Sequence, residues 1–335
     1  MHEVLVDLRV DEDGLRRLQA LPDVHAVVLE TPEEEAARPL PKALLADVQV
    51  LGCTYPPANL ADLRSLRLVQ IASAGYTQLV GLGLPSRGIR ACNALGVFDV
   101  PIAEWNVAMM VNLLRDLRGM IRNQEQGRWD RDSRFQRELR GLTVGLWGYG
   151  GIGRQTARLA KALGMQVHVL TRAGVNARHL IYRVPGTGDP EGQLPDRAFS
   201  REQTGEFLAG LDFLVLALPL TRANEGIVGE AELRALPPTA YVLNPARGPL
   251  IQEPALLRAL GEGWIAGAAL DTHYHYPLPP DHPLWAMPNV IMTPHISGSS
   301  GSPFFLQRVW EIFVDNVARW GQGEPLLNEL PPAEL

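Results

Sequence analysis

Residues 142–153, Leu-Thr-Val-Gly-Leu-Trp-Gly-Tyr-Gly-Gly-Ile-Gly, decide the fold of this chain. The apolar run 142–147 is typical of a buried parallel strand, and residues 155–163 carry a helical pattern. Between them the glycines have the spacing Gly-x-Gly-x-x-Gly, so strand, tight turn and helix stand in the order that a dinucleotide-binding fingerprint requires. These glycines are Gly148, Gly150 and Gly153.

Each glycine has its own part in this interpretation. Gly148 permits the turn, Gly150 lets the backbone approach a pyrophosphate, and Gly153 lets the helix pack against the strand. The helix N-terminus offers unpaired N–H groups and the positive end of its dipole to phosphates. The alternative is a tight turn that binds nothing, but the setting favours a nucleotide site.

The end of the next expected strand, residues 164–170, bears on the choice of cofactor. A carboxylate about 20 residues past the glycines would hold the ribose 2′-hydroxyl of NAD. This chain has Thr171 and Arg172 there, which can hydrogen-bond and neutralise a 2′-phosphate. We therefore expect NADP, with NAD as the alternative if Arg172 is only a solvated loop residue.

Composition and charge narrow the class of protein. The 335 residues, 46% hydrophobic and 20% charged, are typical of a globular chain with two domains. The net charge of −6 argues against nucleic acid or an anionic membrane as partner. No secretory signal is evident, and no apolar run nears the roughly 20 residues that span a bilayer. Cys53 and Cys92 are the two cysteines, and a reduced pair fits the cytoplasm better than one disulfide.

The first hundred residues alternate short apolar runs with helical stretches, which predicts a parallel sheet with helices on both faces. Residues 101–123 then predict a long helix that begins with Pro101. The expected strands are residues 4–8, 26–29, 48–51, 66–71 and 89–92, with helical pieces at 15–21 and 58–63.

A second alternation begins at residue 142, and residues 304–320 predict a last helix that returns to the first domain. The stretch 178–203, rich in Gly, Pro and charge, is longer than an ordinary connection. It could border the cofactor or be a dispensable surface insertion. The expected strands of this second part are residues 143–147, 166–170, 213–218, 240–244, 265–270 and 290–292.

These patterns predict an α/β fold of two doubly wound parallel-sheet domains. A Rossmann-type dinucleotide-binding domain would comprise residues 104–298. A discontinuous, flavodoxin-like substrate domain would comprise residues 1–103 and 299–335.

Three polar side chains follow strands of the second part at their carboxyl ends, where ligands of doubly wound sheets gather. They are Arg247 in Asn-Pro-Ala-Arg-Gly, Asp271 after Gly-Ala-Ala-Leu, and His295 in Thr-Pro-His-Ile-Ser-Gly. Hydride transfer on a 2-keto acid needs a fork of N–H donors for the carboxylate, a proton donor and a group that holds the nicotinamide. These side chains suit that chemistry.

Together with the fingerprint, these segments resemble the D-isomer-specific 2-hydroxyacid dehydrogenase family. The resemblance extends from Ser73-Ala74-Gly75 to the last helix. It includes Leu-Pro-Leu-Thr at 218–221, residues 250–256, and residues 283–291 ahead of Thr293-Pro294-His295.

The resemblance implies a role for each matching residue. Arg247 would bind the substrate carboxylate and 2-oxygen, and His295 would protonate that oxygen as the hydride arrives. Asp271 would hydrogen-bond the nicotinamide carboxamide, although a simple strand-end cap is the alternative. The remaining implied contacts are Ala74 and Gly75 with the substrate carboxylate, Gly151 and Ile152 with the pyrophosphate, and Leu218, Pro219 and Ala246 with the nicotinamide ribose.

One departure from the family pattern concerns the proton donor. The family places a glutamate five residues after the aspartate, where it pairs with the histidine, and this chain has Tyr276 there. Without that carboxylate, His295 should titrate near or below about 6.5. Three explanations stay open: weaker activity, replacement of the glutamate by His273 or His275, or loss of catalysis.

The implied function is an oxidoreductase that transfers a hydride between NADP(H), or NAD(H), and a small D-2-hydroxy or 2-keto acid. The alternatives are a dinucleotide-gated binding protein of the corepressor type, or an enzyme for formate or phosphite. The absence of a basic cluster near residues 73–75 favours an unphosphorylated acid. Residues 124–140 resemble the arm through which family members dimerise, so a homodimer is expected, and we expect no metal.

Overall fold

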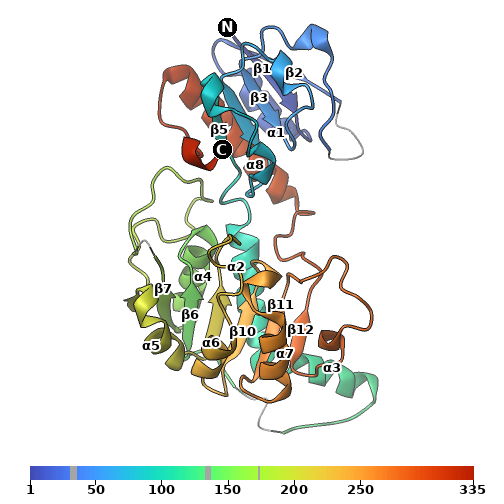
Figure 1. The fold of residues 1–335 in the computed structure, drawn as a ribbon, viewed down its shortest axis with the longest axis vertical. Helices are drawn as coiled ribbons and strands as arrows, with labels where there is room; N and C mark the ends of the chain where they lie inside the picture. The colour runs from blue at the N-terminus through green and yellow to red at the C-terminus, as the bar shows by residue number, and fades with distance from the viewer. Residues whose placement is uncertain (31–35, 133–136, 173) are drawn as a thin grey trace. The chain divides into compact units, whose positions relative to one another are not determined.

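The computed structural model describes residues 1–30, 36–132, 137–172 and 174–335, which form two compact units (Figure 1). The first unit comprises Met1–Phe98, His179–Val184 and Ser300–Leu335. The second unit comprises Asp99–Arg178 and Pro185–Ser299. Each has its own parallel sheet, which confirms the expected fold class.

The sheet of the first unit has five parallel strands in the order β2-β1-β3-β4-β5, which is the flavodoxin-like order. Its helices include α1 (Glu12–Gln19) and α8 (Pro303–Gln322). The strands are β1 (His2–Asp7), β2 (Val24–Val28), β3 (Val50–Cys53), β4 (Leu68–Ile71) and β5 (Arg90–Cys92).

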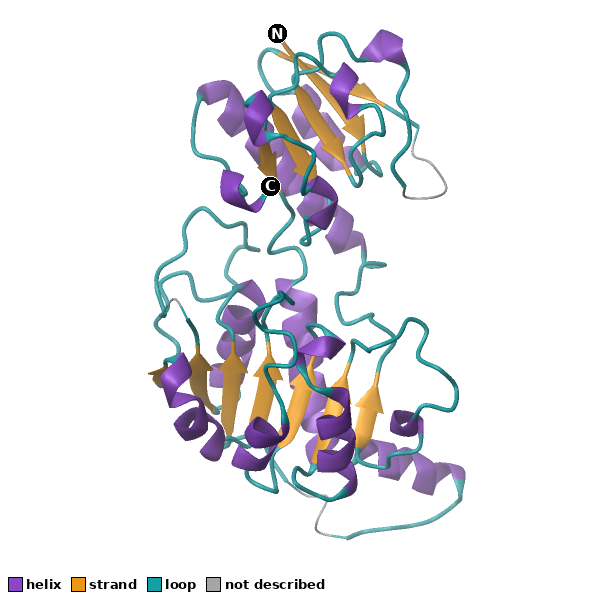
Figure 2. Cartoon of the chain, viewed as in Figure 1, coloured by secondary structure: helices purple, strands orange, loops and turns teal. Residues whose placement is uncertain are grey.

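The sheet of the second unit has seven parallel strands in the order β12-β11-β10-β9-β6-β7-β8, with helices on both faces (Figure 2). The direction of winding reverses between β6 and β9, the place where doubly wound sheets bind dinucleotides. The strands are β6 (Thr143–Trp147), β7 (Gln166–Leu170), β8 (Arg197–Phe199), β9 (Phe213–Leu216), β10 (Tyr241–Asn244), β11 (Gly267–Leu270) and β12 (Val290–Met292). The helices are α2 (Asp99–Leu114), α3 (Leu117–Glu125), α4 (Gly151–Ala162), α5 (Thr204–Ala209), α6 (Glu230–Ala235) and α7 (Glu253–Gly261).

The structure differs from the sequence-based expectation in three elements. The helix expected over 101–123 is two helices, because Asp116 adopts a left-handed φ of 42° and accepts the Gly119 N–H at 3.1 Å as the N-cap of α3. Strand β8 lies inside the stretch 178–203, where no strand was expected. The piece expected at 58–63 contains a short 3₁₀ turn, Leu60–Asp62.

The C-terminal helix α8 completes the first unit, so that the blue and red ends of the chain lie in one unit in Figure 1. Trp310 of α8 is fully buried, and its indole N–H donates to the Arg9 carbonyl at 2.8 Å. Helix α1 approaches it at Gly14, where a Cβ would lie 2.6 Å from the Trp310 Cβ. Truncating so large a buried side chain costs about 3–5 kcal/mol, so this contact secures the discontinuous unit.

Two further expectations concern cysteines and membrane spans. Cys53 and Cys92 are both free and buried, and burial raises the pKa of each thiol. Among the helices in the described ranges, none combines the length and the apolar character that crossing a bilayer demands.

A short part of the β7–β8 connection, His179–Val184, belongs to the first unit, whereas the sequence placed it in the dinucleotide-binding domain. Tyr182 is the reason: it is buried, and its hydroxyl donates to the Glu311 carboxylate of α8. Its N–H donates to Asn328 Oδ1 at 3.0 Å, and the Asn328 N–H donates to the Leu180 carbonyl at 2.9 Å. Sequence patterns carry no signal for contacts of such separation.

The fit of this segment depends on Gly96, whose φ is +96° and whose Cβ would overlap the Tyr182 carbonyl oxygen. Gly96→Ala should cost the segment about 1–3 kcal/mol of local stability and speed amide hydrogen exchange across residues 179–184, measured by mass spectrometry. Gly88→Ala is the matched control, because φ there is +67° and nothing lies within 4 Å of the added Cβ. Equal exchange in both variants would contradict this explanation.

Candidate functional site

The turn between β6 and α4 accepts only glycine at two of the fingerprint positions. Gly148 has a φ of +105°, and a Cβ there would overlap the Ala217 carbonyl oxygen after β9. A Cβ at Gly153 would lie 2.5 Å from the Gly148 carbonyl oxygen. The close approaches thus join the ends of β6 and β9 at the reversal of the sheet, and Leu218 reaches within 3.0 Å of the same position.

The N-terminus of α4 has the backbone geometry of an anion site, and the Asp99 carboxylate of α2 lies beside it at Gly151. Gly150 is its N-cap and provides no side chain, so the first N–H groups, at Gly151 and Ile152, have no capping partner from it. Unpaired N–H groups and the positive end of the dipole are what a pyrophosphate requires. The residues present therefore fit a dinucleotide.

The expected adenosine-side residues lie on the neighbouring strand. Thr171 follows β7, and its N–H donates to the Phe199 carbonyl of β8 at 3.2 Å. Arg172 is exposed next to it. Since β7 pairs with β6, both residues lie at the same edge of the sheet as the glycine turn.

Arg247, Asp271 and His295 lie on the other side of the point where the sheet reverses. They follow three adjacent strands, β10, β11 and β12 respectively. Asn244, 1% exposed, fixes the turn before Arg247: its Nδ2 donates to the Arg247 carbonyl at 2.8 Å, and its Oδ1 accepts the Ala246 N–H at 3.1 Å. A Cβ at Gly248 would lie 2.6 Å from the His273 carbonyl oxygen. The loops after β10 and β11 thus touch through a glycine.

Asp271 is fully buried and is engaged by the loop after β12. Its oxygens accept the Thr293 hydroxyl at 2.5 Å, the Ile296 N–H at 2.9 Å, and both the N–H and the hydroxyl of Ser297. The indole N–H of Trp105 in α2 donates to the Thr293 hydroxyl oxygen at 3.2 Å. These contacts support the strand-end alternative, in which Asp271 anchors the loop that carries His295.

His295 itself is held in an uncommon backbone conformation. Its φ is 59°, in the left-handed region, and its N–H donates to the Asp271 carbonyl at 2.8 Å. A residue without glycine's freedom keeps such a φ only where its surroundings impose it. The hydrogen bonds to Asp271 provide that constraint.

Tyr276 lies beside the His295 ring, with the two ring centroids 5.5 Å apart and the planes at 54°. Partial burial lowers the pKa of His295, the positive charge of Arg247 lowers it further, and Asp271 opposes them. His273 adds to the lowering. The side chain in ring contact with His295 is thus an aromatic one, which cannot stabilise the imidazolium as a carboxylate would.

The two neighbouring histidines, His273 and His275, differ in their surroundings. His273 is buried, its Nε2 is 2.9 Å from the Thr293 carbonyl oxygen, and its effect on His295 is to lower the pKa. Its N–H donates to the Tyr276 hydroxyl at 3.2 Å. His275 is exposed.

Ala74 and Gly75 lie in the first unit, in the loop after β4. The Asn93 amide donates to the Ala74 carbonyl at 2.9 Å, and the Ser73 hydroxyl donates to the Gly75 carbonyl at 2.7 Å. Among the hydrogen bonds of the described residues, none uses the N–H groups of Ala74 or Gly75. The loop is therefore fixed through its carbonyls while its donors stay available.

Sequence reasoning missed several residues that hold this arrangement. Asn244, Thr293 and Ser297 stand inside the motifs, and polar side chains next to the expected site residues are the signal that could have indicated them. Trp105 gave no signal, because its partner Thr293 is 188 positions away.

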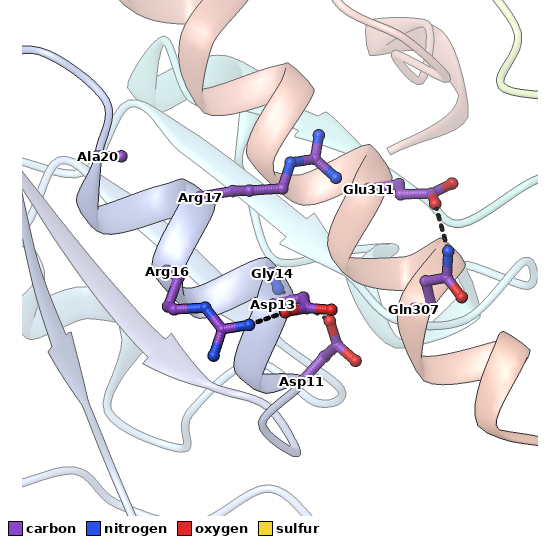
Figure 3. Close-up of a pocket in the computed structure, with 8 residues that line it drawn as sticks. All are labelled: Asp11, Asp13, Gly14, Arg16, Arg17, Ala20, Gln307 and Glu311. Carbon is purple, nitrogen blue, oxygen red and sulfur yellow. Dashed lines mark hydrogen bonds and ion pairs between the residues drawn. The ribbon is translucent and has the colours of Figure 1, made fainter.

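A groove of about 480 Å³ between α1 and α8 of the first unit contains none of the expected site residues (Figure 3). Its charged groups are paired locally: Arg16 with Asp13, Arg17 with Asp315, and Glu311 with Gln307. Across the described ranges, no three His, Cys, Asp or Glu side chains gather as metal ligands would.

Comparison with known proteins adds a family to this geometry. Residues 107–297 match the family model of the D-isomer specific 2-hydroxyacid dehydrogenase, NAD binding domain. A glyoxylate reductase of Thermofilum pendens is 30% identical over 339 residues, covering 99% of this chain and 93% of that protein.

Solved structures agree over nearly the whole chain. A D-isomer specific 2-hydroxyacid dehydrogenase of Xanthobacter autotrophicus Py2, in complex with NADPH and MES, has a TM-score of 0.76 at 28% identity and covers 99% of this chain and 98% of that one. A family protein from Aeromonas salmonicida has a TM-score of 0.75 at 27% identity, with 98% and 99% covered.

The surroundings of His295 predict its titration. The ring should titrate below its ordinary value of about 6.5, and Tyr276→Glu should raise the pKa of His295, because a carboxylate favours the imidazolium. NMR of the ring protons against pH measures both. Tyr276→Gln is the control, since it removes the ring without adding charge; an equal rise in that variant would assign the effect to loss of the ring.

Proposed function

The chain belongs to the D-isomer specific 2-hydroxyacid dehydrogenase family, and from that premise we propose that it interconverts small unphosphorylated 2-keto acids and D-2-hydroxy acids with NADP(H). As a family member it is an NAD(P)-dependent oxidoreductase. The relatives named above favour this function over the corepressor-type alternative. The observation that carries the proposal is that Arg247 and His295 follow β10 and β12, the two strands that flank β11 in the dinucleotide-binding unit.

In this proposal each site residue has one role in binding or proton transfer. When bound, the nicotinamide supplies or accepts the hydride. The exposed Arg247 guanidinium binds the substrate carboxylate and 2-oxygen through its fork of N–H donors. His295 gives a proton to that oxygen during reduction and removes it during oxidation. Ala74 and Gly75 bind the carboxylate through their backbone N–H groups.

The protonation state of His295 sets the pH range of each direction. Reduction needs the imidazolium, so its rate falls as pH rises through the lowered pKa of His295. Oxidation needs the neutral ring, which predominates at neutral pH. Tyr276 thus permits activity in both directions but favours reduction in mildly acidic solution.

We assign Asp271 to positioning rather than to the nicotinamide carboxamide. Its burial and its hydrogen bonds to Thr293, Ile296 and Ser297 support this role. In this proposal Gly151 and Ile152 contact the pyrophosphate. The residues that contact the nicotinamide ribose are Leu218, Pro219 and Ala246.

Glyoxylate is the first substrate to test, because the Thermofilum pendens relative is a glyoxylate reductase. NADP is the preferred cofactor in this proposal, supported by Thr171 and Arg172 in place of a carboxylate and by the NADPH complex of the Xanthobacter protein.

The protein is further proposed to be a cytoplasmic homodimer. Exposed apolar side chains at Leu117, Ile121 and Trp129, with 42%, 47% and 87% exposed, support an interface near α3. The two free cysteines support a reducing compartment. The arm expected over 124–140 lies partly outside the described residues, since 133–136 are among those not described.

Steady-state kinetics test the reaction and the two roles together. The panel is glyoxylate, hydroxypyruvate, pyruvate and phenylpyruvate with NADPH and NADH. Arg247→Ala should raise KM and lower kcat, because the fork holds ground state and transition state alike, whereas His295→Ala should mainly lower kcat. Parental activity in both variants would refute the roles, and a parent that binds NADPH but reduces none of the acids would favour the binding-protein alternative.

Cofactor preference is tested at Arg172. NADPH should bind more tightly than NADH, and Arg172→Ala should weaken NADPH by about 1–3 kcal/mol, the scale of a charge-assisted hydrogen bond, with NADH nearly unchanged. Calorimetric titration measures both. Equal affinity of the parent for the two cofactors would contradict the proposal.

A further inference from the structure

We propose that Arg178, in the long connection between β7 and β8, is a ligand of the cofactor's pyrophosphate. The connection comprises residues 171–196, and its larger part belongs to the stretch 178–203 that was expected either to border the cofactor or to be dispensable. Its contacts with the glycine turn favour the first alternative, and they are all within the second unit.

Tyr149, the residue between Gly148 and Gly150, makes the first contact between the glycine turn and the connection. The Tyr149 hydroxyl donates to Asp189 Oδ2 at 2.6 Å. Asp189 is 6% exposed and also accepts the N–H groups of Gln193 and Leu194, each at 3.0 Å. A turn of the connection is therefore fixed directly to the dinucleotide loop.

Helix α4 makes a second attachment through residues just after its glycines. The buried guanidinium of Arg154 donates to the carbonyls of Tyr149, Asp189 and Asn176. Gln155 Oε1 accepts the Gly188 N–H at 2.6 Å. Buried donors satisfied by backbone carbonyls specify one path for the chain, so residues 176 and 188–194 of the connection are held against the glycine turn and α4.

Arg178 lies between these attachments and points toward the turn. Its N–H donates to the Pro190 carbonyl at 2.9 Å, which fixes its backbone. Its Nη1 is 3.7 Å from the position that a Cβ would take at Gly150. Among the described residues, no carboxylate forms an ion pair with this guanidinium.

One carboxylate and two guanidinium groups, those of Asp99, Arg154 and Arg178, lie around the turn. The Asp99 carboxylate of α2 lies against Gly151, so close that a Cβ there would overlap it. A carboxylate there favours the helix dipole but repels a pyrophosphate. The donors of Arg154 are directed to the carbonyls of Tyr149, Asp189 and Asn176. Arg178 is the group that brings positive charge to Gly150.

The position of Arg178 separates its effect from that of Arg172. Gly150 is the glycine at which the backbone approaches the pyrophosphate, a group that NADP and NAD share. Arg172 follows β7, on the side of the ribose whose 2′-phosphate only NADP has. Loss of Arg178 should therefore weaken both cofactors by the same factor.

Calorimetric titration of the full chain with NADPH and with NADH tests this. Arg178→Ala should raise both dissociation constants about 10- to 100-fold, the scale of a hydrogen bond to a charged group, and Arg178→Lys should recover part of the loss. Arg183→Ala is the matched control: it removes an exposed arginine from the same connection and should change neither constant. Thermal melting without cofactor verifies that each variant is folded.

Two results would overturn the proposal. Unchanged affinity for both cofactors in Arg178→Ala would mean that the guanidinium does not touch the phosphates. A loss confined to NADPH would place it at the 2′-phosphate instead of the pyrophosphate. Because binding is measured without substrate, failure here is distinct from failure of the proposed reaction.

Discussion

The carboxylate of Asp271 is fully buried at the end of β11 and accepts hydrogen bonds from three residues of the loop after β12. A buried charge without such partners is costly, so the strand end and the loop stabilise one another or neither persists. This constraint holds His295 at its left-handed φ and in reach of Arg247's charge. The hydrogen bond from Trp105 to Thr293 also connects this loop to helix α2. The loop that carries His295 is therefore held by a buried polar cluster at the end of β11, next to the apolar core of the second unit.

Glycines are also required on both sides of the sheet edge in the second unit, at the turn after β6 and at the loop after β10. At Gly148 and Gly248 the absence of a Cβ lets a backbone carbonyl from another loop come into contact. Loops from separate strands can then share one small region, which a side chain of any size would push apart. The glycine turn provides the positive end of a helix, and the opposite half provides a guanidinium and an imidazole. The two sides of this sheet edge thus differ in the groups that they offer to a ligand.

Sequence patterns were sufficient wherever the physics is local. The fingerprint predicted β6 and α4 because strand, turn and helix signals follow one another directly in the chain. The apolar runs predicted 11 of the strands described in the two sheets, all but β8. They failed where distant residues decide. The break at Asp116 depends on one left-handed residue, and the docking of Tyr182 depends on Glu311 and Asn328, more than a hundred positions away. The environment of Asp271 was likewise invisible, although Ser297 stood in the same motif as His295.

The packing of Trp310 on Gly14 has a consequence for biosynthesis. Strands β1–β5 leave the ribosome well before α8, so their unit lacks this helix until residues 303–322 have been made. Contacts of such long sequence separation form slowly because the loop between them must first be closed. The second unit, whose strands are contiguous apart from one excursion, can become native while the first still exposes the apolar face that Trp310 and Phe313 cover. The N-terminal half of the first unit is thus the part of the nascent protein most in need of protection from aggregation.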